Sequence, residues 1–321
     1  MGIQIITPGI MTTIQDNGRI GYGEIGIAPS GALDTDAMEI ANLLVGNQMG
    51  EAVLECTLLG PTLRFTQDNV IAITGAYMKP RLDNRELPMN AAVAVRAGEE
   101  LSLGLAEYGC RAYIAFTGGL KIPESLGSKS TNMQCSLGGL DGRALKAMDE
   151  IAFEKPVAAL PDMEYRVSRV RYGMASPQQI RVVLGPQEDY FSEEGIHTFI
   201  TGTYRLTSDS NRMACKLSGP AIAGKQAADI ISDGIVLGSI QVSSNGQPII
   251  MLADRQTTGG YAKIGTVIST DIPLLAQCKP EDVISFKPVT LAAAQKLYKK
   301  QVNTLKKLRK QMKDLEYSVY Y

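Results

Sequence analysis

The sequence has one histidine, no tryptophan and few aromatic residues, which make up 6% of the chain. A single histidine excludes a metal site built on two histidines, and His197 is the only residue that could supply the histidine of a catalytic triad. We expect His197 to be an ordinary surface or helix residue. The cysteines are odd in number and include no C-x-x-C pair, which favours reduced thiols in a cytosolic protein; they are Cys56, Cys110, Cys135, Cys215 and Cys278.

Long apolar runs and a strong net charge are also missing. No run of about 18 apolar residues occurs, so we expect no transmembrane segment. Residues 1–10 lack a basic region followed by a long apolar one, so we expect no signal peptide. The net charge is −1 at pH 7, which excludes the basic footprint typical of nucleic-acid-binding proteins. The sequence therefore predicts a cytoplasmic protein.

Glycine is abundant instead, with 32 residues, and apolar residues make up 45% of the chain. Between residues 51 and 117, short apolar or alternating segments are separated by Gly, Pro or Asn, without helical patterns between them. This spacing predicts a mainly β fold, a sandwich or barrel, and argues against a doubly wound parallel sheet. One short helix is predicted over residues 34–44, where apolar residues recur at helical spacing. Asn245-Gly246 is expected to form a tight hairpin turn.

A repeated ending suggests two similar barrels. Residues 149–157 and 281–289 each contain an acidic turn, a strand and then Lys-Pro-Val. We therefore predict an N-terminal domain over residues 1–165, a C-terminal domain over residues 166–290 and a separate tail over residues 291–321.

Two glycine motifs do not fit their usual functions. Gly21, Gly23 and Gly26 match the spacing of a dinucleotide fingerprint, but a turn precedes them where a buried strand is required. The spacing of Gly219, Gly224 and Lys225 resembles a P-loop, but the next residue is glutamine where a magnesium-binding Ser or Thr is required. We reject both sites.

Residues 248–271 carry the densest group of potential ligand-binding side chains. An apolar run from Ile249 to Ala253 is followed by the polar residues 254–258, two glycines and a second β-rich run, residues 263–269. The pattern predicts a β-hairpin with a donor-rich tip. The tip offers an arginine fork for a carboxylate or phosphate and glycines that let a ligand approach the backbone. A solvated hairpin tip without function is the alternative.

The tail is predicted to form a basic amphipathic helix. Apolar residues from Leu291 to Leu315 recur every three or four positions. The helix carries eight basic residues against two acidic ones. It could dock on an acidic partner, a neighbouring copy of the chain or a membrane surface, or it could close over its own barrel with its lysines in solvent.

Several motifs together resemble the biotin-dependent carboxyltransferase / Kip antagonist family, also named allophanate hydrolase subunit 2. The resemblance extends over residues 3–290. Its most specific part is ADRQTTGGYAKIG at residues 253–265; TPGIMTTIQDNGRIGYGEIGIAPSGALDTDA at 7–37 and LGPQEDYF at 184–191 add to it. The family fold, a pair of cyclophilin-like β-barrels, agrees with the mainly β pattern, to which the sequence adds few short helices and the C-terminal amphipathic helix.

The resemblance implies an activity and partners, because the family includes the C subunit of the prokaryotic ATP-hydrolysing 5-oxoprolinase. It implies a complex with a Kip-inhibitor-like B subunit, in which ATP, expected as its Mg²⁺ complex at a site shared with the partner, activates 5-oxoproline. The A subunit of 5-oxoprolinase would then complete ring opening to glutamate. Self-association of the chain is a further expectation.

Chemistry and resemblance together give a set of candidate site residues. The expected catalytic residues are Arg255 and Lys263 as cations, and Asp254, which could orient Arg255 or assist with magnesium. No residue of this chain is assigned as a metal ligand. The expected substrate-binding residues are Gln256, Thr257, Thr258, Gly259, Gly260, Tyr261, Gln187, Asp189, Arg19, Ser30 and Asp34.

Two other functions stay open at this point. The chain could be the carboxyltransferase component of a biotin-dependent urea-type carboxylase; since it has no Met-Lys-Met site, the biotin would be attached to another chain. It could also be a non-catalytic Kip antagonist that binds a kinase inhibitor protein. The chain lacks a recognisable ATP motif and a catalytic histidine cluster, which is compatible with such a regulator.

Overall fold

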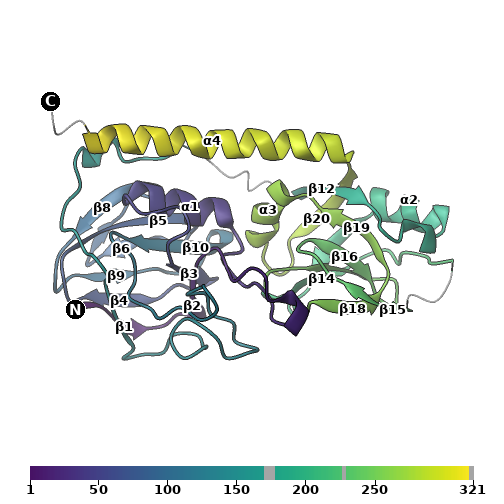
Figure 1. Cartoon of the computed structure of the whole chain (residues 1–321), viewed down its shortest axis with the longest axis horizontal. Coiled ribbons are helices and arrows are strands. Elements are labelled where there is room, and N and C mark those ends of the chain that lie inside the picture. Colours follow the sequence, from purple (N-terminus) through teal and green to yellow (C-terminus); the bar gives the residue numbers. More distant parts are fainter. Residues whose placement is uncertain (170–177, 226–228, 318–321) are drawn as a thin grey trace. The chain divides into compact units, whose positions relative to one another are not determined.

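A computed structural model describes residues 1–169, 178–225 and 229–317 (Figure 1). They form two compact units, each of which is described by itself. Unit 1 comprises Met1–Arg19, Ser30–Tyr172 and Asn303–Tyr321, and unit 2 comprises Ile20–Pro29 and Gly173–Val302. Among the described residues, no helix is both long and apolar enough to cross a membrane.

Unit 1 is built of two antiparallel sheets. The first has the order β11 (Glu150–Ala152), β1 (Gly2–Thr7), β4 (Thr62–Phe65), β9 (Glu100–Ser102), β6 (Arg81–Leu82) and β7 (Arg85–Glu86). The second has the order β2 (Met11–Gln15), β3 (Val53–Thr57), β10 (Tyr108–Phe116), β5 (Asn69–Tyr77) and β8 (Ala92–Val95). The predicted mainly β fold is confirmed, with the strands of this unit arranged in two sheets rather than in one closed ladder.

Strand alternation fills two cores in unit 1. Leu54 and Ile114 lie in the main core with residues of the first sheet such as Ile5. The opposite face of β10 carries Tyr113, which packs with apolar residues of α1 (Thr35–Leu44) in the second core. Side chains of a strand point alternately to the two faces of the sheet, so one strand serves both cores.

The predicted helix over residues 34–44 is confirmed as α1. Asp34 is its N-cap, and the Asp34 Oδ1 atom accepts a hydrogen bond from the Ala37 N–H at 2.9 Å. A capping carboxylate satisfies one of the backbone donors that have no partner within the helix. Gly23–Ile25, within the rejected dinucleotide motif, forms only a 3-10 helix, η1.

Unit 2 contains a closed seven-stranded barrel. Its order is β12 (Gln178–Leu184), β19 (Lys263–Val267), β16 (Ser239–Val242), β17 (Pro248–Met251), β14 (Ala214–Ser218), β13 (Thr203–Leu206) and β20 (Val283–Pro288). The β12–β20 pair is parallel, and the other pairs are antiparallel. A separate pair joins β15 (Asp229–Gly234) to β18 (Thr258–Tyr261).

Aromatic packing closes one side of this barrel. Phe199, from α2 (Glu193–Thr201), stacks on Phe286 of β20 with ring centroids 4.4 Å apart. Tyr204 lies against the same ring, with its centroid 5.5 Å away. His197 is exposed on α2, as expected. The remaining helices of unit 2 are α3 (Ile272–Ala276) and the 3-10 helices η3 (Glu188–Tyr190) and η4 (Ser269–Asp271).

The predicted hairpin over residues 248–271 is wrong in its pairing. Strands β17 and β19 do form, but each pairs with β16, which lies between them. The predicted tip contains a further strand, β18, which pairs with β15. Apolar alternation marks a segment as a strand but does not specify which strand lies beside it, so neighbours in sequence were wrongly paired.

The predicted C-terminal helix is confirmed as α4 (Leu291–Tyr317), the long yellow helix of Figure 1. Its residues Leu305, Leu308 and Met312 are buried in the second core of unit 1, with α1. The second half of the helix, which contains these three residues, therefore packs on a domain of its own chain, as one of the two alternatives predicted. Unit 1 is completed by the 3-10 helix η2 (Met163–Tyr165).

Candidate functional site

Two cations of unit 2, Lys263 and Arg255, are bonded to one segment of three consecutive residues. The Lys263 Nζ atom donates to Asp233 Oδ2 at 2.6 Å and to the Gly234 carbonyl oxygen at 3.2 Å. The Arg255 Nε atom donates to the Ile235 carbonyl oxygen at 3.1 Å. Both cations therefore bind the segment of residues 233–235.

Gln187 holds the Lys263–Asp233 pair in position. Its side-chain oxygen accepts from the Lys263 N–H at 3.0 Å, and its side-chain nitrogen donates to Asp233 Oδ2 at 3.3 Å. The hydrogen bond from Lys263 is the main cause that lowers the pKa of the Asp233 carboxyl. The Lys263 side chain is only 3% exposed, whereas that of Asp233 is 54% exposed. Solvent or a ligand can therefore approach this ion pair from its carboxylate side.

Arg255 has no acidic partner among the residues that the structure describes. Its guanidinium donates to the carbonyl oxygens of Ile235 and, at 3.2 Å, Leu252. Burial lowers the pKa of Arg255, since a charged group loses solvation there. A guanidinium has five N–H donors in a planar fork. This half-buried cation, bonded to neutral carbonyls, is therefore complementary to a carboxylate or a phosphate.

Strand β18 passes very close to its neighbours at Gly259. A Cβ atom placed there would lie 2.6 Å from Ile235 Cδ1 and 2.8 Å from Gln241 Nε2. Gln241, which is buried, also donates from Nε2 to the Tyr261 carbonyl oxygen at 3.4 Å. A larger residue at position 259 would therefore displace the ends of the Ile235 and Gln241 side chains, and glycine lets the β18 backbone lie alongside the segment that holds both cations.

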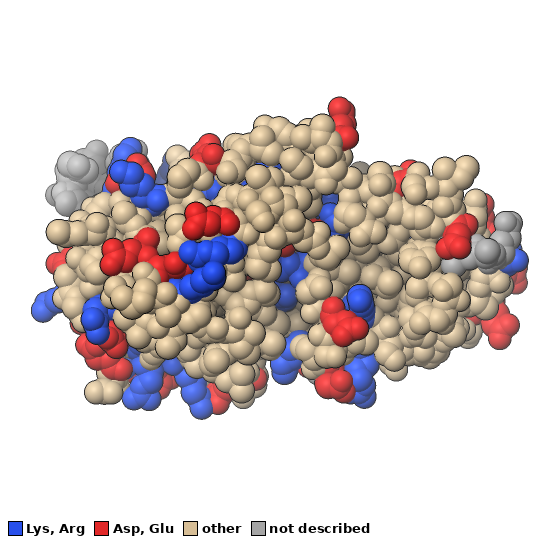
Figure 2. Space-filling model, turned by 90° about the horizontal axis from the view of Figure 1, so that it is seen from below, with Lys and Arg blue, Asp and Glu red and all other residues tan. Residues whose placement is uncertain are grey.

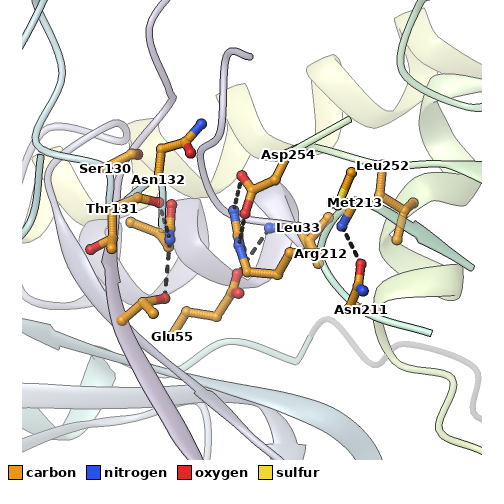
Figure 3. Close-up of polar contacts among 12 residues, drawn as sticks. Leu33, Glu55, Ser130, Thr131, Asn132, Asn211, Arg212, Met213, Leu252 and Asp254 are labelled. Carbon is orange, nitrogen blue, oxygen red and sulfur yellow. Dashed lines mark hydrogen bonds and ion pairs between the residues drawn. The ribbon is translucent and has the colours of Figure 1, made fainter. Parts of the chain in front are cut away.

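The sequence suggested that Asp254 could orient Arg255, but the structure pairs Asp254 with another residue. Its carboxylate pairs instead with Arg212, at 2.9 Å from Nε and 3.3 Å from Nη2 (Figure 3). Asp254 is 6% exposed and Arg212 3% exposed. The Asp254 N–H also donates to the Arg212 carbonyl oxygen at 3.0 Å. Asp254 thus anchors the start of the loop that presents Arg255.

The other expected residues of the 256–261 stretch line this region to different extents. Gln256 and Thr258 are exposed, and Thr257, Gly260 and Tyr261 are half-buried. The Thr257 carbonyl oxygen accepts from the Ile235 N–H at 2.9 Å, which ties the loop to the segment of residues 233–235. Asp189 is exposed on η3.

Arg19, Ser30 and Asp34 belong to unit 1, whereas the other expected site residues belong to unit 2. The Arg19 side chain is buried and donates to the carbonyl oxygens of Ser125 and Ser130. Asp34 is fully buried as the cap of α1. The Ser30 Oγ atom is buried and has no hydrogen-bond partner in the described structure. Arg19 and Asp34 thus order the backbone of unit 1 in the structure.

Sequence reasoning missed a buried polar row in unit 1. Thr13, Glu55, Tyr113 and Thr74 face one another across four strands and are each at most 1% exposed. The Glu55 carboxylate accepts from the Tyr113 hydroxyl at 2.9 Å. It also accepts from the Leu33 N–H at 3.0 Å (Figure 3). A glutamate inside the apolar strand VLECT is the signal that could have identified this row, since such a residue is normally buried only with partners.

Metal-binding geometry and surface charge add little to the site. Among the described residues, no group of three or more His, Cys, Asp and Glu side chains is arranged to hold a metal ion. On the face seen in Figure 2, basic and acidic side chains are interspersed, without a large patch of one sign. The most specific charge arrangement is therefore the local one at Arg255 and Lys263.

Comparisons with known proteins agree on one family. Residues 25–288 match the family model described as "Carboxyltransferase domain, subdomain A and B". The chain is 37% identical to the C subunit of 5-oxoprolinase from Escherichia coli over 92% of its length and 93% of that protein. It is 35% identical to the C subunit of 5-oxoprolinase from Haemophilus influenzae over 96% of its length and 98% of that protein.

Longer proteins contain a similar region. The chain is 32% identical to urea amidolyase of Saccharomyces cerevisiae over 95% of its length but only 18% of that protein. The crystal structure of the urea amidolyase of K. lactis superposes with a TM-score of 0.89 at 30% identity, over 96% of this chain and 20% of that one. The fold of the whole chain is thus also found as one part of a larger polypeptide.

Proposed function

The chain belongs to the family defined by the carboxyltransferase domain, subdomains A and B, and we propose that it is the C subunit of an ATP-dependent 5-oxoprolinase. It would act with the Kip-inhibitor-like B subunit, which shares the site, and with the A subunit, which completes hydrolysis to glutamate. The proposal is supported by relatives of that name that match this chain over nearly the full length of both proteins.

The observation that carries the proposal is the Arg255 guanidinium, half-buried and without a carboxylate partner among the described residues. The substrate 5-oxoproline carries a carboxylate next to its lactam ring. A planar fork of donors in a partly desolvated position fits that carboxylate, or a phosphate oxygen, in two-point contact. An exposed arginine would bind either group weakly because water screens the charge.

Each residue of the site has a definite part in this mechanism. An unstrained lactam is a poor electrophile, and a phosphoryl group from ATP would activate it at the amide oxygen. Arg255 would hold the anionic substrate or the transferring phosphate in place. Lys263, fixed by Asp233 and Gln187, would supply positive charge where oxygen becomes more negative, without having to reorganise. Backbone N–H groups near Gly259 and Gly260 can serve as further donors.

Substitution of Arg255 tests this function. In the complex reconstituted with both of its partner proteins, Arg255→Ala is expected to lower kcat/KM for 5-oxoproline by about 100-fold, the typical cost of one preorganised donor to a developing charge. Arg255→Lys should recover only part of this, because lysine lacks the planar fork. The readout is ATP-coupled release of glutamate.

Arg205→Ala is the matched control, since Arg205 is an exposed arginine of unit 2 paired with Glu281. Its activity is expected to equal that of the unsubstituted chain. Full ATP-coupled activity of Arg255→Ala would contradict the proposed role of the cation.

The second candidate function is carboxyl transfer from biotin in a urea-type carboxylase, which the similarity to urea amidolyase favours. The biotin would be carried by another chain. An avidin blot of the proteins that co-purify with this chain separates the two functions. A biotinylated partner, together with urea-dependent use of bicarbonate, would support the second function over the first.

A further inference from the structure

Helix α4 carries one long apolar seam, interrupted by a single glutamine and formed by Leu291, Ala294, Tyr298, Gln301, Leu305, Leu308, Met312 and Leu315. The spacing alternates between three and four residues, as in a helix whose apolar stripe packs against a partner. In unit 1, the second half of this seam is buried in the second core. The first half differs, because none of residues 291–302 is buried.

In unit 2, the first half of the seam borders an open apolar groove of about 690 Å³. The barrel side of the groove is formed mainly by Val183, Val236, Leu237, Val267 and Ile268. The large side chains that border it remain in solvent: Leu291 is 62% exposed, Val236 58% and Tyr298 53%. Several exposed apolar groups that meet in one groove are typical of an interaction surface.

The charged residues on the first half of the helix are all basic. Residues 291–302 contain three lysines, Lys296, Lys299 and Lys300, and no acidic residue. Lys299 lines the groove, and no acidic side chain does among the described residues. A second copy of the chain would bring like charges together if the two helices paired, which opposes association. A segment with acidic side chains beside its apolar face would complement the groove in both respects.

We propose that this groove is the docking surface for an amphipathic helix of the Kip-inhibitor-like partner, with two or three apolar side chains in the groove and acidic residues beside them. A helix laid into an apolar groove is a recurrent mode of recognition. The inference rests on the proposed function, because that function supplies the identity of the partner.

The groove and the candidate site share one segment of the chain. Val236 and Leu237, in the groove, directly follow Ile235, whose carbonyl oxygen accepts from Arg255. The Ile235 N–H donates to the Thr257 carbonyl oxygen, and the Val236 N–H donates to the Ser239 hydroxyl at 3.2 Å. A partner seated on Val236 and Leu237 therefore fixes the segment that positions the cation.

The test is a calorimetric titration of the purified Kip-inhibitor-like partner with variants of the full chain, together with glutamate release by the complete complex. The double variant Leu291→Asp with Tyr298→Asp places charge in the groove, and both of the residues that it replaces are exposed. It is expected to raise the Kd for the partner at least about tenfold. The matched control is Leu105→Asp with Tyr108→Asp, a pair in unit 1 that is 65% and 62% exposed. Its Kd is expected to be unchanged.

A charge reversal tests the acidic character of the partner. Lys296→Glu with Lys299→Glu and Lys300→Glu is expected to weaken binding by about tenfold or more, with a smaller loss at high salt. The same reversal at Lys306, Lys307 and Lys310, exposed on the second half of the helix, is the control. Circular dichroism checks that each variant is folded.

The outcomes separate this inference from the proposed function. Unchanged Kd in the groove variants, in a complex that releases glutamate, would overturn the docking surface and leave the function intact. A wild-type chain that does not bind the Kip-inhibitor-like partner and supports no glutamate release would overturn the function and the inference with it. A wild-type dimer that the groove variants dissociate would assign the groove to a second copy of the chain and overturn the proposed partner.

Discussion

At the scale of single residues, the buried pair of Arg212 and Asp254 gives Asp254 a structural role, whereas the sequence predicted a catalytic one. The two side chains are 3% and 6% exposed, and they are joined by two contacts. Ion pairs of this kind add little net stability when intact, because both charges had to be desolvated. Removal of the Asp254 carboxylate is costly, since it takes two hydrogen bonds away from a buried guanidinium.

We therefore expect Asp254→Asn to lower the free energy of unfolding of unit 2 by about 3 kcal/mol, the usual cost of breaking a buried ion pair. Urea denaturation followed by fluorescence or circular dichroism measures this change. Asp189→Asn, at an exposed position on η3, is the control and should change stability little. A stable Asp254→Asn variant that has lost glutamate release would instead give Asp254 the catalytic role expected from the sequence.

At the scale of elements, helix α1 carries a carboxyl group with an unusually high pKa, that of Glu39. Burial, and secondarily the nearby Asp36 carboxylate, raises the pKa of Glu39 to about 7. The pKa of Glu39 in the folded protein lies above that in the unfolded chain, so the fold favours the protonated carboxyl. The contribution of protonated Glu39 to stability is fully present below about pH 4.5 and is lost as the pH rises through 7.

Glu39→Gln removes this titration. We expect the variant to be more stable than the wild type by about 1 kcal/mol at pH 8, a value reduced for the partial exposure of the side chain. At about pH 5 the two proteins should have similar stability. Thermal unfolding of both at the two pH values measures the difference. Equal Tm values at the higher pH would show that Glu39 titrates normally.

At the scale of the whole molecule, each unit has its own buried core. Leu308 of α4 lies in the second core of unit 1. Phe286 of β20 lies in the barrel of unit 2, 4.4 Å from Phe199 between ring centroids. Units with separate cores can unfold in separate steps, so a single two-state transition is not expected for the chain.

Leu308→Ala is accordingly expected to lower the unfolding transition of unit 1, by about 2–3 kcal/mol, and to leave that of unit 2 in place. Phe286→Ala should have the opposite pattern, with a cost of about 3–4 kcal/mol in unit 2. Differential scanning calorimetry of the full chain resolves the two transitions. A single transition that both substitutions shift equally would show instead that the units unfold together.

The sequence by itself determined much of the local structure. The spacing of apolar residues specified α1 and α4, and the Asn245-Gly246 turn between β16 and β17 followed from glycine, which has φ +77° at residue 246. The mainly β fold followed from alternation and turn residues. These features depend on side chains a few positions apart, so a linear pattern is enough to predict them.

Only the tertiary structure decided which strands are neighbours and which side chains meet. Placement of β16 between β17 and β19, and pairing of β18 with β15, brings Arg255 and Lys263 onto residues 233–235. The tertiary structure likewise pairs the buried Asp254 with Arg212, and the buried Glu55 with Tyr113. Alternation fixes which face of a strand is buried but not the strand beside it, because pairing depends on contacts between residues distant in sequence.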